Sequence, residues 1–234
     1  MHDLIQRTCM NKNVIIVAGG KGLRMGNDIP KQFLLLGGKP VLMHTLEIFH
    51  HTDATLDIIL VLPYEQQAYW QHLCKQYTFN VPHKIAPGGE TRFHSVKNGL
   101  EMISGNGGLI AIHDGVRPFV SKEVIEESFE KAKQYNAIIP IVDVVETIRE
   151  IQGNESQTVN REKYKLVQTP QVFNLDLLQK AYSQPYSDSF TDDASVVEAF
   201  GEKVHLIQGN RENIKITTPF DLLIGESIVH SRKK

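Results

Sequence analysis

The sequence predicts an α/β fold, with a mostly parallel, twisted sheet and helices on both of its faces. Three observations predict it. Short apolar runs alternate along the chain with longer segments of helical periodicity. The runs are rich in Val and Ile and almost uninterrupted, which is typical of strands buried on both faces of a parallel sheet. A glycine-rich loop directly follows the first run, where α/β folds commonly hold phosphate groups. Right-handed crossovers are expected between successive parallel strands.

Four apolar runs supply the expected strands of this sheet. They are residues 14–18, 58–62, 109–112 and 137–142. Asp114 follows the third run closely. Ligands of open α/β sheets collect at the carboxyl ends of the strands, so Asp114 is a candidate site residue.

Helices are expected between these runs because apolar side chains recur there at helical spacing. The three groups are Leu42, Leu46 and Phe49; Val96, Leu100 and Ile103; and Val124, Ser128, Phe129 and Ala132. Ser121, with Glu123 two residues later, is expected to cap one helix, and Thr191 before two Asp residues to cap another. Thr218 followed by Pro219 predicts a helix that begins at Pro219.

Residues 143–168 interrupt this alternation. Val145, Thr147 and Arg149 alternate with Glu146, Ile148 and Glu150, residues 153–156 form a turn cluster, and residues 158–167 can run back. We therefore expect a β-arm that leaves the sheet of a single domain over residues 1–234. The arm is poor in core-forming side chains, so it is either an exposed hairpin or a segment that embraces a second subunit.

Composition and charge narrow the possible partners. The 234 residues are 41% hydrophobic, and 25 Lys and Arg face 27 Asp and Glu, for a net charge of −2. These values are ordinary for a globular protein and unlike the basic balance of nucleic-acid binders. No apolar run approaches the roughly 18 residues of a membrane span, and the first residues lack a signal core. Two cysteines without metal spacing indicate a reducing compartment, so we expect a cytoplasmic protein with no nucleic-acid or membrane partner.

The glycine-rich loop over residues 17–26 matches neither of two common phosphate-binding loops. A P-loop needs Ser or Thr after Gly-Lys, but Gly22 follows Lys21 here. A dinucleotide-binding loop has its last glycine one residue earlier than Gly26. The loop instead has cations of its own, Arg24 and Lys31, which could hold a nucleotide's phosphates and stabilise charge in a transition state.

Six short motifs follow one another along the chain, and together they indicate a family. Residues 18–25 with Pro30-Lys31-Gln32 resemble the signature of nucleotidyltransferases. The others are residues 88–95, 113–118, 169–171, 191–195 and 213–217. From residue 13 to about residue 227, the chain resembles the family of CTP-dependent polyol-phosphate cytidylyltransferases, in particular its 2-C-methyl-D-erythritol 4-phosphate branch. The resemblance implies a Rossmann-like nucleotidyltransferase fold. It also implies transfer of CMP from CTP to that polyol phosphate, with release of pyrophosphate, in the non-mevalonate route to isoprenoids.

The resemblance also implies roles for individual residues. Arg24 and Lys31 would stabilise the transition state, and Lys215 and Arg161 would position the attacking phosphate. Arg161 would act from the arm on the site of the other subunit of a homodimer. The expected nucleotide contacts are Ala18, Gly19, Gly20, Gly22, Gly89, Glu90 and Ser95. The expected contacts to the acceptor substrate are Arg117, Thr147, Thr169 and Thr191.

A metal site is expected at Asp114, both from the resemblance and from its place after a strand. Mg²⁺ binds one or two protein carboxylates together with phosphates and water, and Asp114 fits that pattern. His113 beside it is expected to be a packed side chain and not a ligand, because the histidines show no paired metal spacing.

Two alternatives to this function stay open at this point. Ribitol 5-phosphate is an alternative acceptor, because the loop reads Val17-Ala18-Gly19-Gly20 where many members of the methylerythritol branch have Pro-Ala-Ala-Gly. Glu90 and Glu146 also stand where Asp is common, whereas the motif over residues 191–195 favours methylerythritol phosphate. A non-catalytic nucleotide-binding regulator is the second alternative. The presence of Arg24, Lys31, Asp114 and Lys215 argues against it, since a non-catalytic binder has no need to keep all four.

Overall fold

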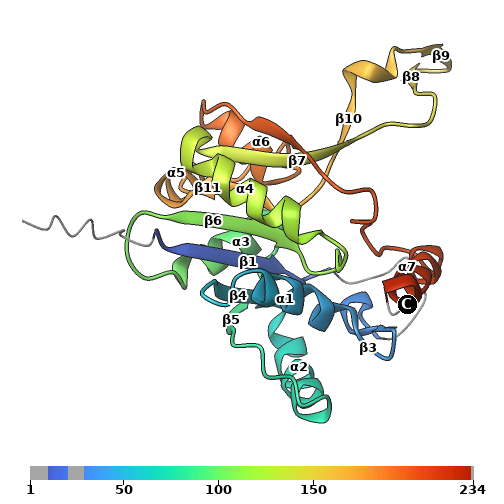
Figure 1. The fold of residues 1–234 in the computed structure, drawn as a ribbon. Helices are drawn as coiled ribbons and strands as arrows, with labels where there is room; N and C mark the ends of the chain where they lie inside the picture. Colours follow the sequence, from blue (N-terminus) through green and yellow to red (C-terminus); the bar gives the residue numbers. More distant parts are fainter. Residues whose placement is uncertain (1–9, 21–28, 233–234) are drawn as a thin grey trace, which may run out of the picture.

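The structure, a computed structural model, describes residues 10–20 and 29–232 (Figure 1). Its centre is an eight-stranded sheet in the order β10-β7-β11-β6-β1-β4-β5, with β12 also paired to β7. The strands are β1 (Lys12–Val17), β4 (Asp57–Leu62), β5 (Lys84–Pro87), β6 (Leu109–Asp114), β7 (Ala137–Asp143), β10 (Lys165–Val167), β11 (Gln171–Asn174) and β12 (His205–Gln208).

Most of these strand pairs are parallel. β1 pairs parallel with β4 and β6, β4 with β5, and β7 with β12. The predicted class is confirmed, and the four apolar runs form β1, β4, β6 and β7. Antiparallel β11 lies between β6 and β7, and antiparallel β10 pairs with the end of β7. These two strands make the sheet mixed.

Seven helices flank the sheet in the described part of the chain. They are α1 (Val41–Thr52), α2 (Tyr64–Gln76), α3 (Arg92–Glu101), α4 (Lys122–Tyr135), α5 (Leu175–Ala181), α6 (Asp193–Ala199) and α7 (Pro219–Arg232). Side chains of the strands alternate between two apolar clusters: Ile16 packs with Phe49 of α1, whereas its neighbour Ile15 packs with Phe93 of α3. Helices therefore cover both faces, as predicted (Figure 1). Within the described residues, no helix combines the length and apolarity needed to cross a bilayer.

A third, smaller apolar cluster joins α7 to a two-stranded ribbon. The ribbon is formed by β2 (Leu35–Leu36) and β3 (Lys39–Pro40), which lie between a short 3₁₀ turn, η2 (Lys31–Phe33), and α1. Leu36, Phe119 and Ile216 are buried in this cluster, and Val229 of α7 packs against it. The ribbon and η2 place Lys31 and Gln32 beside the end of β1.

The helix starts were predicted with one error. Ser121 accepts a hydrogen bond from the N–H of Val124, and α7 begins at Pro219, both as expected. The predicted cap Thr191 is wrong, because α6 begins one residue later and Asp192 caps it. The carboxylate of Asp192 accepts from the N–H of Ser195 (2.9 Å) while the hydroxyl of Ser195 accepts from the N–H of Asp192 (3.1 Å). That reciprocal arrangement satisfies two backbone donors, which a Thr at position 191 is one residue too early to do.

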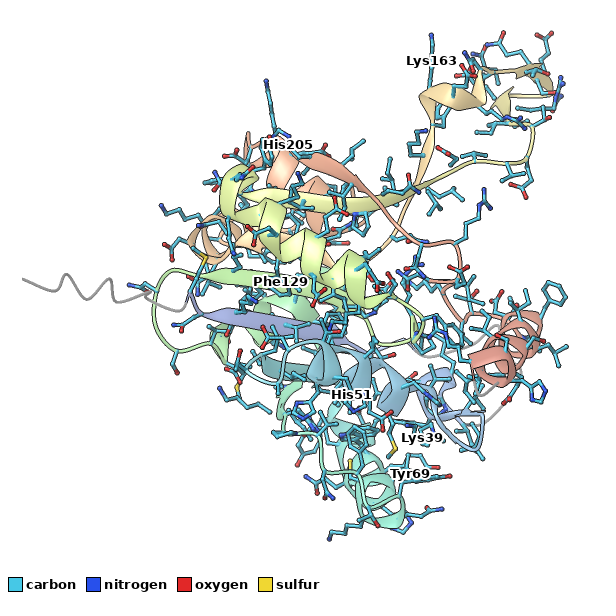
Figure 2. The ribbon with its side chains drawn as sticks, in the orientation of Figure 1. Lys39, His51, Tyr69, Phe129, Lys163 and His205 are labelled. Atoms are coloured by element: carbon cyan, nitrogen blue, oxygen red, sulfur yellow. The ribbon has the colours of Figure 1, made fainter. Side chains whose placement is uncertain are left out.

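The arm over residues 143–168 projects away from the sheet (Figure 1). Its tip is a hairpin of β8 (Arg149–Gln152) and β9 (Glu155–Thr158), in which every residue is exposed. The expected return strand over residues 158–167 is interrupted by a 3₁₀ turn, η3 (Arg161–Lys163), before β10 rejoins the sheet. Lys163 accordingly lies far from the helices on the sheet (Figure 2). A role of this arm in dimerisation stays a prediction.

Candidate active site

A pocket opens at the carboxyl ends of β1 and β6. The two strands are parallel neighbours, and Val17 at the end of β1 is in register with Asp114 at the end of β6. Strands β4 and β5 lie on the other side of β1, so the order of strands reverses between β1 and β6. Such a reversal leaves a crevice in which α/β proteins bind their ligands. The cavity has a volume of about 240 Å³.

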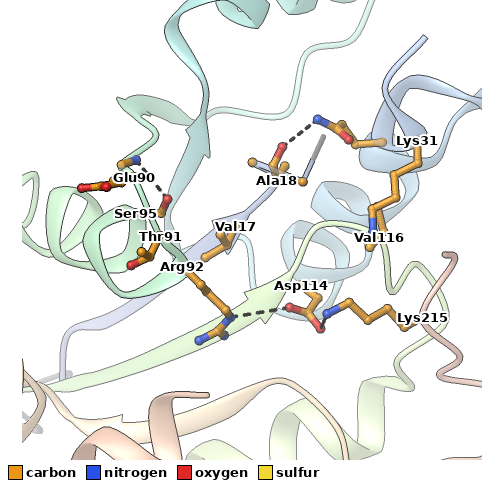
Figure 3. A pocket seen from close by; sticks show the side chains of 14 residues that line it. Val17, Ala18, Lys31, Glu90, Thr91, Arg92, Ser95, Asp114, Val116 and Lys215 are labelled. Atoms are coloured by element: carbon orange, nitrogen blue, oxygen red, sulfur yellow. Dashed lines mark hydrogen bonds and ion pairs between the residues drawn. The ribbon is translucent and has the colours of Figure 1, made fainter. Parts of the chain in front are cut away.

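Nine of the predicted site residues line this pocket (Figure 3). They are Ala18, Gly19, Gly20, Lys31, Gly89, Glu90, Ser95, Asp114 and Lys215. Segments from both halves of the sequence therefore meet at one cavity, as the order of motifs suggested. Gly22 and Arg24, which were also predicted, lie outside the described residues.

Asp114 stands among three cations. Its Oδ2 lies 3.0 Å from Nζ of Lys215 and 3.0 Å from Nε of Arg117, and its Oδ1 lies 4.0 Å from Nε of Arg92. Burial opposes ionisation of this carboxyl group, but the charges of Lys215, Arg92 and Arg117 outweigh burial and hold the pKa of Asp114 well below its usual range. The side chain is therefore a carboxylate at neutral pH.

Hydrogen bonds behind Asp114 fix its backbone. The N–H of Asp114 donates to Oγ1 of Thr169 (3.1 Å), which lies 3.0 Å from Nδ1 of His113. Nε2 of His113 lies 3.0 Å from the carbonyl of Arg117 and must donate to it, so Nδ1 accepts from the Thr169 hydroxyl. Burial lowers the pKa of His113 to about 4, which keeps this ring neutral. His113 is thus packed, as expected, and buried Thr169 supports Asp114 from behind.

Arg117, a predicted substrate contact, has a second structural partner. Besides Asp114, its guanidinium donates to the carbonyl of Asn213 (2.9 Å). Asn213 is fully buried and donates in turn to the carbonyl of Thr169 (2.8 Å). Arg117 therefore joins the segment that carries Lys215 to the end of β6, and it does not line the cavity.

The two glycine-containing segments are held close to the cavity by side-chain hydrogen bonds. Gln32 donates from Nε2 to the carbonyl of Ala18 (2.7 Å). The N–H of Gly89 donates to Oγ of Ser95 (3.0 Å). A Cβ at Gly89 would lie 2.4 Å from Cβ of His94, so only glycine fits this position.

Besides Arg117 and Thr169, three more residues predicted to contact the acceptor do not line the cavity of their own chain. Thr147 and Arg161 belong to the arm, and both are exposed. The guanidinium of Arg161 donates to the carbonyl of Val145 within the arm. Thr191 is exposed just before α6, where its N–H donates to Oγ of Ser195 (3.0 Å). Within the described residues, a single chain brings the predicted nucleotide contacts together with Lys215, but it does not bring the predicted acceptor contacts of the arm to the cavity.

Sequence reasoning missed several residues that line the pocket, above all Arg92. Val17, Gln32, Thr91 and Val116 line it as well. Arg92 begins α3 directly after the second glycine segment, and Thr91 caps that helix. The signal was present, since a cation after a glycine segment and a cap is a common phosphate-side arrangement. The partners of Arg92 could not be inferred, because one of them is Asp193, 101 residues later in the chain.

The fold and this site together define an α/β enzyme of the nucleotidyltransferase class: a mostly parallel sheet, glycine segments and a cation-ringed carboxylate at the reversal of strand order. The sequence matches the family described as 2-C-methyl-D-erythritol 4-phosphate cytidylyltransferase over residues 13–231. The chain belongs to this family.

Individual relatives agree with the family match. Proteins of that name from Phocaeicola vulgatus and Bacteroides thetaiotaomicron are 64% and 63% identical to the chain, over 94% of it and 100% of each relative. A crystal structure of the Thermus thermophilus cytidylyltransferase has a TM-score of 0.77 at 31% identity, covering 94% of this chain and 100% of that one. The 4-diphosphocytidyl-2C-methyl-D-erythritol synthase of Anaerococcus prevotii has a TM-score of 0.80 at 28% identity, covering 94% and 96%.

Proposed function

We propose that the chain transfers CMP from CTP to 2-C-methyl-D-erythritol 4-phosphate, in isoprenoid biosynthesis. The products are 4-diphosphocytidyl-2-C-methyl-D-erythritol and pyrophosphate. The observation that carries the proposal is the pocket at the ends of β1 and β6, where Lys31, Lys215 and Asp114 line one cavity with both glycine segments. The names of the relatives at 60% identity or more support the same reaction and the same acceptor.

The pocket suits an in-line displacement. An oxygen of the acceptor phosphate attacks the α-phosphorus of CTP and forms the new P–O bond, while the bond to the bridging oxygen breaks and pyrophosphate leaves. The attacking oxygen is already anionic, so the reaction needs alignment and charge stabilisation more than a strong base. Lys31 and Lys215 both line the cavity and supply positive charge to it (Figure 3), and Arg24 is proposed to add to it.

Asp114 fits a magnesium ligand. Its Oδ2 contacts Lys215 and Arg117, whereas the ion pair of Oδ1 among the described residues is the longer 4.0 Å contact to Arg92. In the described part of the chain, Asp114 belongs to no group of three or more His, Cys, Asp or Glu side chains that could hold a metal. Mg²⁺ suits such a site, since it binds few carboxylates and completes its shell with phosphates and water. When bound, the ion would neutralise negative charge on the phosphates.

Recognition of cytosine is proposed for the backbone near β1. The exocyclic amine of cytosine is a donor where uracil has an acceptor, so backbone carbonyls of Ala18 and Gly19 suit cytosine. Gln32 already holds the Ala18 carbonyl in place (2.7 Å). The Gly89 amide and Ser95 would read the remaining part of the base edge.

The acceptor half of the site is proposed to come from a second chain. Thr147 and Arg161 are exposed on the arm, together with apolar side chains such as Ile151 and Leu166. A symmetric dimer would allow the arm of each subunit to reach its partner's pocket. We expect a cytoplasmic homodimer in which Arg161 binds the acceptor phosphate in trans.

Mixed dimers test this arrangement. An Arg161→Ala chain with an intact pocket is mixed with a Lys215→Ala chain that has an intact arm. If the arm acts in trans, each mixed dimer gains one complete site, so random mixing restores about a quarter of the parent activity. Lys163→Ala, in the same turn of the arm, is the matched control and should keep parent activity. No recovery on mixing would place Arg161 in the site of its own chain.

The first experiment for the reaction itself is pyrophosphate release. The chain is incubated with CTP, Mg²⁺ and 2-C-methyl-D-erythritol 4-phosphate, beside a reaction with D-ribitol 5-phosphate. We expect release in the first tube only. Release only in the second would keep the reaction class and change the acceptor. CTP binding in calorimetry without release in either tube would indicate a nucleotide-binding regulator.

A further inference from the structure

A buried ion pair lies directly behind the pocket. Nη2 of Arg92 contacts Oδ2 of Asp193 at 2.5 Å, and the hydroxyl of Tyr182 donates to Oδ1 of the same carboxylate at 2.6 Å. Asp193 is fully buried and does not line the cavity, whereas Arg92 does. Burial, followed by the charge of Asp193, raises the pKa of Tyr182 well above its usual value, so the phenol stays a donor.

Arg92 has a carboxylate at each end of its guanidinium group. Nη2 contacts Asp193 closely, while Nε faces Oδ1 of Asp114 at 4.0 Å (Figure 3). The guanidinium is planar and its donors form a rigid fork, so the short contact at one end fixes where the other end points. Asp193 thus decides how closely Arg92 approaches Asp114.

The charges around Asp114 show what the contact between Arg92 and Asp193 prevents. Asp114 has cations on both sides, and Lys215 and Arg117 already engage its Oδ2. If Arg92 had no other carboxylate partner, Coulomb attraction would draw it onto Oδ1, the oxygen that is otherwise lightly engaged. Both oxygens of Asp114 would then be covered by protein cations, and neither would face the nucleotide.

A contribution to stability alone does not explain the ion pair between Arg92 and Asp193. Replacing a buried ion pair by apolar side chains of similar size is often neutral or stabilising, so stability does not require a carboxylate here. The pair also joins segments far apart in sequence, because Arg92 begins α3 and Asp193 begins α6. The Arg92–Asp193 pair differs from a purely structural ion pair in its position, because Arg92 lines the pocket.

We propose that Asp193, held by the Tyr182 hydroxyl, is a positioning residue that keeps Arg92 away from Asp114, so that Oδ1 of Asp114 remains available to the magnesium complex of CTP. This inference rests on the proposed function, because it assumes that CTP and Mg²⁺ bind at Asp114. It assigns a role to two residues, Asp193 and Tyr182, that do not line the cavity.

The test is calorimetry of CTP binding, with and without Mg²⁺, alongside steady-state turnover. In Asp193→Asn, Arg92 loses its anionic partner and moves onto Asp114. We expect CTP affinity with Mg²⁺ and kcat to fall by about 10–100-fold, as for loss of groups that orient a metal ligand. CTP affinity without Mg²⁺ should change by less than about threefold. Tyr182→Phe removes one hydrogen bond and should shift the same quantities in the same direction by a smaller factor.

Asp192→Ala is the matched control. Asp192 caps the same helix and contacts Gln171 (2.8 Å), but none of its hydrogen bonds involves Arg92. Its loss should lower the thermal unfolding midpoint and leave the magnesium-dependent part of CTP affinity unchanged. An equal loss in Asp192→Ala would reduce Asp193 to a structural role and overturn the inference, as would parent-like magnesium dependence in a folded Asp193→Asn chain.

If Asp193→Asn does not fold, Tyr182→Phe decides, and parent-like binding and kcat in that variant overturn the inference. Failure of the proposed function looks different, because the unmutated chain would then release no pyrophosphate. Calorimetry of CTP and Mg²⁺ needs no acceptor, so a wrong acceptor leaves the test of Asp193 intact.

Discussion

The pocket and the arm are built in opposite ways. In the pocket, charged side chains sit on the ends of buried strands and are fixed by further contacts, as Asp114 is by Thr169 and Lys215. In the arm, all residues of β8 and β9 are exposed, and Arg161 contacts only the arm's own backbone at Val145 in the hydrogen bonds described. The described charged side chains of the pocket are fixed by contacts within one chain, whereas the exposed residues of β8 and β9 have no such support from the core.

The largest expected effect concerns stability. Phe49 of α1 is fully buried and its ring packs edge-on against the His113 ring, with centroids 4.8 Å apart. Phe49→Ala should lower the free energy of unfolding by about 3–5 kcal/mol. Ile151→Ala, at the 66% exposed tip of the arm, should change it by less than about 0.5 kcal/mol in dilute solutions of single chains. Urea unfolding measures both, and similar losses would remove the contrast between the regions.

The next effect concerns turnover in the pocket. Lys215→Met keeps most of the side chain's length but removes the charge 3.0 Å from Asp114. We expect kcat/KM to fall by about 10²–10³, as for loss of a group that stabilises transition-state charge. The mass in light scattering should be unchanged, because Lys215 lines the pocket and is not part of the arm. Lys122→Met, in an exposed pair with Glu126 on α4, is the control, and near-parent turnover in Lys215→Met would contradict the assignment.

The smallest effect is a dependence of stability on pH, which should come from the buried part of the chain and not from the arm. Nε2 of His83 accepts from the Trp70 indole (2.9 Å), and Nδ1 lies 2.8 Å from the Val81 carbonyl, to which it donates. Burial lowers the pKa of His83 below 6.5. The unfolded chain therefore binds a proton first as the pH falls, so stability decreases below about pH 6.5. His83→Gln should flatten this decrease in urea unfolding between pH 7.5 and 5.5, and equal slopes would contradict it.

Much of the fold was predictable because its signals are local. The runs that became β1, β4, β6 and β7 are apolar on both faces, and only a sheet covered by two layers of helices buries such runs. Asp114 was predictable as a site residue because it ends one of those strands. β12 was not predicted, because its residues are mostly exposed and its apolar and polar side chains alternate only weakly. Its pairing with β7 alone defines it as a strand.

The missing parts of the site depend on contacts between distant segments. Arg92 and Asp193 are 101 residues apart, and no periodicity or spacing relates them. Thr169 and Arg117 were expected to contact substrate, and that stays a prediction. In this structure Thr169 accepts from the backbone N–H of Asp114, and Arg117 donates to its carboxylate. A polar residue in a motif can serve the ligand or the residue that holds the ligand, and sequence does not distinguish these cases.

The exposure of the arm has a consequence for how such proteins diverge. Substitutions at β8 and β9 disturb no core, so in the proposed dimer the arm is free to change as long as the receiving surface of the partner changes with it. Two species can thus keep interchangeable pockets while their arms and receiving surfaces drift apart in matched pairs. Hybrid assemblies of this chain with a distant relative would then form poorly, although each chain alone retains a pocket of the same design.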